Sequence, residues 1–199
     1  MCIQNQNIER LWEIFIKRAN LNFESTLFLK WVNKERESAY MDETPYIFNH
    51  AERQYLFTHI LSNEQYVDVK HFNIHFFKCF EKFFRLINQE QNRLELYRRG
   101  FRVVDFMGLV GISTLWDIVL NAVEEKVRDM GVNMLVDLHL RLSDNTEPED
   151  AINTWKQFIS RCMDRLVPGS DPVTISNTVE LLAQFLDRYD GKKPIRPEY

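Results

Sequence analysis

The sequence predicts an all-α fold in which antiparallel helix pairs stack as in an α-solenoid. Its 199 residues include only six glycines and six prolines, which is few for a turn-rich β protein. Apolar residues recur at spacings of three and four along most of the chain, as they do on one face of a helix. No segment has the pattern of a convincing strand, so no sheet is expected.

Two amphipathic helices are predicted in the N-terminal part of the chain, over residues 7–19 and 23–37. Asn22 stands at the N-cap position of the second helix. The following segment, 38–46, contains Pro45 and is predicted to be an exposed loop. The apolar stripes of the two helices consist of Ile8, Leu11, Trp12, Phe15 and Ala19, and of Leu27, Phe28, Trp31 and Val32.

Residues 46–99 contain neither glycine nor proline, so helices are predicted along this part of the chain. One helix is expected over 49–61 and a second over 69–90, with the segment "SNEQY" between them. A short third helix is expected over 92–105, interrupted at Gly100.

The most regular pattern in the chain lies in residues 111–143, where two consecutive helices are predicted. Ser113 is the predicted N-cap of the first helix. Gly131 lies within the second helix, where it costs about 1 kcal/mol relative to alanine and indicates that a neighbouring helix crosses closely. The predicted apolar faces are Leu115, Trp116, Val119 and Leu120 in the first helix, and Val123, Val127, Met130, Met134 and Leu138 in the second.

The C-terminal part is predicted to contain an acidic loop over 144–150, a helix over 149–166 and a last helix over 173–189. The prolines and glycine of "PGSDP" separate the two helices. We expect one helical-repeat domain over 1–190 and a mobile tail over 191–199. The predicted apolar residues are Ile152, Trp155, Phe158, Ile159, Cys162 and Leu166, and then Val179, Leu182, Phe185 and Leu186.

Composition narrows the classes of function that the chain can have. A formal net charge of -4 and a pI near 5.8 argue against a dedicated nucleic-acid-binding protein. The three cysteines, Cys2, Cys79 and Cys162, are far apart, which favours reduced thiols over a disulfide framework. Neither a secretory signal nor a membrane span is visible, so a soluble cytoplasmic or nuclear protein is expected.

The stretch "HFNIHFFKCFEKFF", residues 71–84, raises the question of a metal site. His71, His75 and Cys79 would stack along one side of a helix, and zinc accepts both residue types as ligands. The zinc protease motif, however, requires a glutamate where this chain has Phe72. We therefore expect a buried helix face and no metal or cofactor. That face consists of Phe72, Phe76, Phe80, Phe83 and Ile87.

Neither the cysteines nor the arginine-rich segment is expected to form a functional site. A nucleophilic thiol needs a base or cationic surroundings, whereas Cys79 and Cys162 lie in apolar helical patterns and are expected to be buried and uncatalytic. The segment "NRLELYRRGFRVV" brings four arginines near two aromatic residues, as nucleic-acid-binding surfaces do. In an acidic chain, solvated arginines paired with Glu90 and Glu95 are the expected arrangement. The arginines are Arg93, Arg98, Arg99 and Arg102.

Several motifs resemble the helical-repeat region that precedes the catalytic domain of the largest ubiquitin-specific proteases, the fat facets type and its relatives. They are the phenylalanine-rich "FEKFF" at 80–84, the "GISTLWDIVL" helix at 111–120, the amphipathic helix from Val123 and "FISRCMDRL" at 158–166. The resemblance spans residues 8–166 and is best between 72 and 166.

The resemblance implies an armadillo-like or HEAT-like scaffold within a much longer deubiquitinase, a thiol protease of the ubiquitin conjugation pathway. The cysteine and histidine boxes of that family have no counterpart here, so no catalytic residue is carried over and the segment is expected to be inactive alone. Its expected partners are other proteins, namely the catalytic domain of the same parent chain, substrates or adaptors. Direct binding of ubiquitin, and a free-standing adaptor unrelated to ubiquitin, remain alternatives.

Overall fold

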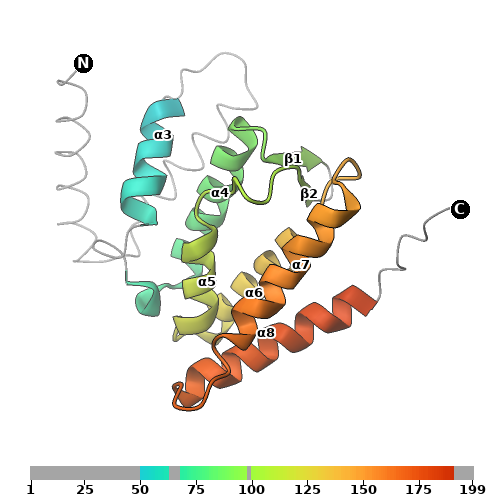
Figure 1. Ribbon diagram of the computed structural model, residues 1–199. Helices are drawn as coiled ribbons and strands as arrows, with labels where there is room; N and C mark the ends of the chain where they lie inside the picture. Colours follow the sequence, from blue (N-terminus) through green and yellow to red (C-terminus); the bar gives the residue numbers. More distant parts are fainter. Residues whose placement is uncertain (1–49, 63–67, 98–99, 191–199) are drawn as a thin grey trace, which may run out of the picture.

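The structure of the chain, a computed structural model, describes residues 50–62, 68–97 and 100–190. Six α-helices and one two-stranded sheet make up most of this part (Figure 1). The prediction of a mainly helical protein is thereby confirmed. Four predicted segments lie outside the described residues: the helices 7–19 and 23–37, the loop 38–46 and the tail 191–199.

The first described helices form the phenylalanine-rich part of the core. α3, His50–Leu56, continues into a π-helical turn, Phe57–Leu61, and packs against α4, Ile74–Glu90. A 3-10 turn, Val69–His71, precedes α4, and Asn73 caps α4 by accepting a hydrogen bond of 2.9 Å from the N–H of Phe76. The predicted helices over 49–61 and 69–90 are confirmed in outline. The predicted buried face is confirmed as well: Phe72, Phe76, Phe80, Phe83 and Ile87 are all in the core.

The prediction of a short helix over 92–105, and of no strand anywhere, is wrong. This segment is an antiparallel hairpin in which β1, Leu94–Tyr97, pairs with β2, Gly100–Val103. Along β2 Phe101 and Val103 are buried and Arg102 is exposed, which is the alternation of a strand packed on one face. Gly100 adopts a φ of 148°, which a helix does not accommodate.

Helices α5, Ile112–Asn121, and α6, Glu125–Leu140, form the central pair. The predicted face of α5 is buried as expected, and so are Val127, Met134 and Leu138 of α6. A Cβ atom on Gly131 would lie 3.0 Å from Cγ2 of Val119, which confirms the predicted close crossing.

Two predictions about this helix pair are wrong. Val123 lies before α6 and is 73% exposed, because the chain turns there between the two helices. Ser113 is an exposed residue of the first turn of α5 and not its cap. The cap is Gly111, whose φ of 86° lies in the left-handed region that glycine tolerates.

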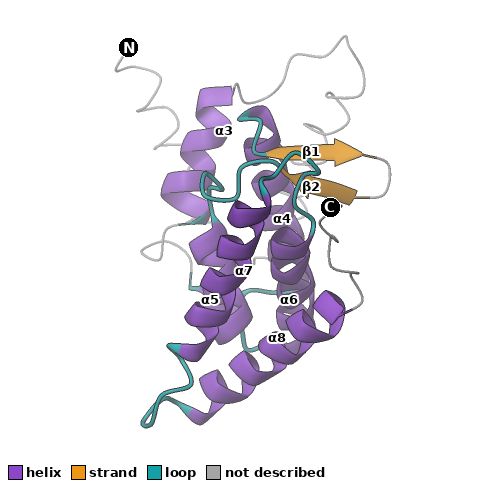
Figure 2. Cartoon of the chain, turned by 45° about the vertical axis from the view of Figure 1, so that its right-hand side comes forward, coloured by secondary structure: helices purple, strands orange, loops and turns teal. Residues whose placement is uncertain are grey.

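The last two helices, α7, Pro148–Met163, and α8, Pro172–Asp190, cover the central pair. In Figures 1 and 2 they run beside each other with opposite chain directions. Each buried stripe departs from the prediction, since Ile152 and Ile159 of α7 and Val179 and Leu186 of α8 are exposed. The buried residues are Ala151, Thr154, Phe158 and Cys162 of α7, and Asn177, Thr178, Leu181 and Phe185 of α8.

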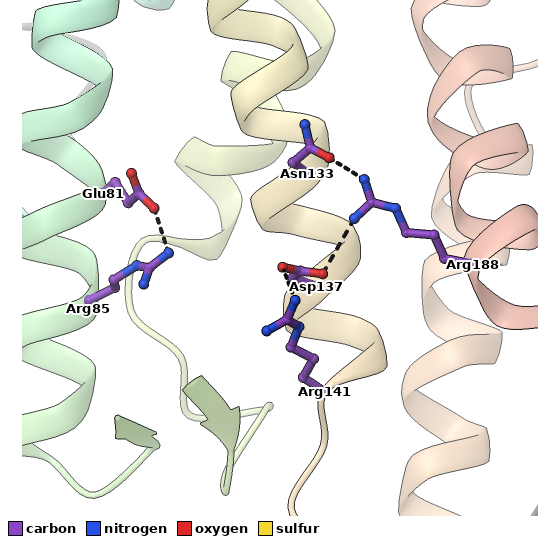
Figure 3. Close-up of polar contacts among 6 residues, drawn as sticks. All are labelled: Glu81, Arg85, Asn133, Asp137, Arg141 and Arg188. Carbon is purple, nitrogen blue, oxygen red and sulfur yellow. Dashed lines mark hydrogen bonds and ion pairs between the residues drawn. The ribbon is translucent and has the colours of Figure 1, made fainter. Parts of the chain in front are cut away.

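A polar cluster ties α8 to α6 (Figure 3). The guanidinium of Arg188 lies 3.4 Å from Oδ1 of Asp137 and donates a hydrogen bond to Asn133. Asp137 also forms an ion pair of 3.0 Å with Arg141, the residue that caps the C-terminus of α6. Arg188 and Asp137 belong to different elements, so the cluster adds a polar contact to the apolar packing of α8 on the central pair.

Candidate functional site

The stretch considered as a metal site forms part of the helical core. Cys79 of α4 is buried, and burial raises the pKa of its thiol well above the usual range. The side chains of His71 and His75 lie outside the described part of the chain. Among the residues that the structure describes, no group of histidine, cysteine and carboxylate side chains is arranged to hold a metal ion.

The second described thiol, Cys162 of α7, is also buried. Burial raises its pKa to about 11, although the nearby positive charges of Arg165 and Arg161 oppose the rise. A thiol with so high a pKa carries almost no thiolate at neutral pH and is a poor nucleophile there. Cys2 lies outside the described residues.

The arginine-rich segment does not form a single surface in the described part of the chain. Arg93 donates a hydrogen bond to Gln91, and Arg102 pairs with Asp144 in the loop before α7. The acid expected to pair with this segment, Glu90, is instead held by Arg53 of α3. Arg98 and Arg99 lie outside the described residues.

One concave feature of the described residues is an open groove of about 520 Å³ between the end of the hairpin and the start of α7. One wall is the segment Val103–Met107, and the other combines the loop 142–147 with the first half of α7. Figures 1 and 2 both place the hairpin beside the start of α7. The residues of the second wall are Leu142, Asn145, Thr146, Glu147, Asp150, Asn153, Thr154 and Gln157.

Backbone hydrogen bonds hold the two walls in register. The N–H of Val103 donates to the carbonyl of Arg141 at 2.8 Å, and the N–H of Ser143 donates to the carbonyl of Val103 at 2.7 Å. Asp105 of the first wall accepts a hydrogen bond of 2.9 Å from the N–H of Gly108, which closes a tight turn. The groove is thus bounded by fixed backbone on both sides.

The lining of the groove is acidic and partly apolar. Asp105, Glu147 and Asp150 line it, and none of its lining residues is lysine, arginine or histidine. Met107 contributes an apolar surface that is 75% exposed, with Val104 next to it. Oγ1 of Thr146 is buried at the groove and has no hydrogen-bond partner. The groove therefore combines negative charge with exposed apolar surface.

A buried histidine supports the groove from behind. His139 of α6 lies with its ring centroid 4.5 Å from that of Phe106, a lining residue, and 4.6 Å from that of Phe158. Its Nδ1 lies 2.7 Å from the carbonyl of Leu135, and its own carbonyl accepts a hydrogen bond of 2.8 Å from Trp155. Burial lowers the pKa of His139 to about 4, so the ring is neutral at physiological pH. It is a packing residue and not an acid–base group at neutral pH.

The sequence alone does not predict this groove. The segment 144–150 is recognisable as an acidic loop, and "DFMG" at 105–108 contains the exposed methionine. The two walls are, however, nearly forty residues apart in places, and only their pairing through Val103 and Leu142 brings them together. The useful signal in the sequence is the combination of an acidic loop with apolar residues in a glycine-containing turn.

Comparison with known proteins gives relatives of one kind. The human protein named ubiquitin carboxyl-terminal hydrolase 9Y is 26% identical over 98 residues, and mouse ubiquitin carboxyl-terminal hydrolase 9X is likewise 26% identical over 98 residues. The Drosophila melanogaster protein named probable ubiquitin carboxyl-terminal hydrolase FAF is 28% identical over 89 residues. About half of this chain is similar to large ubiquitin-specific proteases.

The extent of the similarity is limited on both sides. It covers 49% of this chain with the human relative and 45% with the fly relative. It covers only 4% and 3%, respectively, of those much longer proteins. No family profile matches the chain.

None of the helices in the described residues is both long and apolar enough to cross a membrane.

Proposed function

We propose that this chain is a non-catalytic, protein-binding segment of a large ubiquitin-specific protease. In such a parent, it would position substrates, adaptors or the catalytic domain, while the removal of ubiquitin takes place elsewhere in the protein. The observation that carries the proposal is the similarity to the human, mouse and fly hydrolases, in which the matched segment is a small fraction of the protein.

The physical properties of the described residues support an interaction role. Buried helices from α4 to α8 share one apolar core, which gives the surface a fixed shape. The described thiols have raised pKa values because they are buried, which does not favour nucleophilic chemistry. We further propose that the helix pairs continue as an armadillo-like or HEAT-like stack in the parent, since stacked pairs present long binding surfaces.

The proposal is tested by deleting residues 50–190 from the full-length protein encoded by the transcript. The deleted protein should hydrolyse a minimal ubiquitin–fluorophore substrate at the rate of the intact protein, because the proposed segment takes no part in the chemistry. Its co-purification with protein partners should decrease. A matched control deletes an equally long helical segment elsewhere in the full-length protein.

Two results would contradict the proposal. A transcript that encodes no cysteine and histidine boxes would remove the ubiquitin-specific protease parent and favour a free-standing adaptor. A strong loss of minimal-substrate hydrolysis on deletion, with the catalytic domain still folded, would place this segment within the catalytic machinery.

A further inference from the structure

We propose that the groove between the hairpin and α7 binds an extended peptide segment in which a large apolar side chain is flanked by lysine or arginine. The inference rests on the proposed protein-binding role of the chain and names the chemistry of its partner.

The charge of the groove favours a basic partner. Glu147 and Asp150 on one wall carry two carboxylates that form no ion pair with a described residue. Acidic residues near the first turn of α7 also stabilise the helix dipole. Asp105 on the opposite wall adds a third carboxylate, which accepts the hydrogen bond from the N–H of Gly108 and lies near the guanidinium of Arg93.

The apolar part of the groove favours a large hydrophobic side chain between the charges. Met107 is among the most exposed apolar side chains of the described residues, and it lies beside Val104 and Phe106. Methionine is flexible and polarizable, and such side chains adapt to varied apolar partners. An apolar surface rimmed by polar groups is typical of interaction sites.

The size and polar groups of the groove favour an extended chain over an enclosed small ligand. A volume of about 520 Å³ lies within the usual range for binding sites, but the groove is open to solvent. Asp150, Asn153 and Gln157 lie at helical spacings along one face of α7, so their side chains form a row beside the groove. The side-chain amides of Asn153 and Gln157 offer hydrogen bonds to a peptide backbone.

The test measures peptide binding to the full 199-residue chain by fluorescence anisotropy. The probe is a labelled peptide, Gly-Lys-Lys-Leu-Arg-Lys-Gly. One control peptide replaces the basic residues with acidic ones, and another replaces leucine with glycine. We expect the probe to bind at least about tenfold more tightly than either control, and its affinity to fall as salt is raised.

Variants of the chain locate the binding. Neutralising the groove with Glu147→Gln and Asp150→Asn should weaken the affinity for the probe by about five- to tenfold, because exposed charge pairs contribute modestly to binding. Glu180→Gln with Asp187→Asn on α8 makes the same change in net charge outside the groove and should leave affinity unchanged. Met107→Ala should weaken binding, whereas Met163→Ala, an exposed methionine outside the groove, should not.

The inference is overturned if the probe does not bind or if it binds no better than the control peptides. It is also overturned if the double substitution in α8 weakens the binding of the probe as much as the double substitution in the groove. In each of these cases the proposed function still stands when deletion of residues 50–190 reduces partner capture by the parent protein. Conversely, suppose that the probe binds tightly in the groove while deletion of residues 50–190 leaves partner capture unchanged. That result would support the groove as a peptide-binding site and reject the proposed function.

Discussion

The side-chain amide of Asn177 in α8 donates a hydrogen bond of 2.9 Å to the backbone carbonyl of Leu120 in α5. The last carbonyls of a helix have no partner within that helix, so this bond satisfies one end of α5 from a distant element. Asn177 is buried, and water cannot readily replace it. The contact therefore caps the C-terminus of α5 and also holds α8 against it.

Replacing Asn177 with alanine should lower the free energy of unfolding by about 2 kcal/mol, because it removes the bond and leaves a buried carbonyl unsatisfied. Urea denaturation monitored by circular dichroism measures the change. Ser176→Ala, on the exposed neighbouring residue, serves as the control and should stay within about 0.5 kcal/mol. Equal stabilities for the two variants would show that the Asn177 contact does not contribute.

Two glycines with positive φ provide a matched pair. Gly111 caps α5 with a φ of 86°, and an added Cβ would lie 2.5 Å from Cζ of Phe57. Gly169 has a φ of 93°, but nothing lies within 4 Å of an added Cβ. Gly169→Ala should cost only the left-handed strain, about 1 kcal/mol, whereas Gly111→Ala should cost about 3 kcal/mol or more because it also overpacks the core.

Thermal and urea unfolding of both glycine variants give the comparison directly. The difference between the two values isolates the steric term, because the backbone strain is similar at both positions. If Gly111→Ala were no more destabilising than Gly169→Ala, then Phe57 would have room to move, and the close packing of the turn at Phe57–Leu61 against α5 would be in error.

The sequence predicts α4, α5 and much of α6 because their buried faces are apolar at helical spacing. In α4 the phenylalanines repeat every three or four residues, and all of those predicted to be buried are in the core. In α8 the buried stripe includes Asn177 and Thr178, whose hydrogen bonds allow polar residues to be buried. A prediction that follows apolar residues alone passes over these positions and selects Val179 and Leu186 instead.

The spacing of apolar residues predicts neither the hairpin nor the groove, for different reasons. Residues of "LELYRRGFRV" have good helix propensity, and only the short alternation around Phe101 and the glycine at 100 indicate strands. The groove depends on the pairing of Val103 with Leu142, a contact between segments far apart in sequence. Tertiary contacts of this kind overrule local propensity and cannot be read from spacing.

The buried thiols should resist modification in the folded protein. In a Cys2→Ser background, a thiol reagent at about pH 8 should react slowly with Cys79 and Cys162, because burial raises both pKa values and blocks access. Denaturant should make both thiols react as fast as free cysteine. Rapid reaction of either thiol without denaturant would contradict the buried environment and reopen the question of a nucleophile.

Stability should fall as His139 begins to titrate in the unfolded chain. Its pKa is lowered from 6.5 to about 4 in the folded protein, chiefly by burial and in part by the positive charge of Arg161. Between these values the unfolded chain binds a proton that the folded chain does not, so acid favours unfolding. The expected loss between about pH 7 and about pH 5 is about 2 kcal/mol.

The variant His139→Asn isolates this contribution. Asparagine retains a hydrogen-bond donor near the carbonyl of Leu135 but does not titrate, so its stability should depend less on pH by about 2 kcal/mol over the same range. Urea denaturation at several pH values measures both slopes, and comparing slopes removes any constant cost of the substitution. Carboxylates titrate equally in both proteins. Identical slopes would mean that His139 takes up its proton in the folded state as readily as in the unfolded state, and hence that it is not buried among Phe106, Phe158 and Trp116.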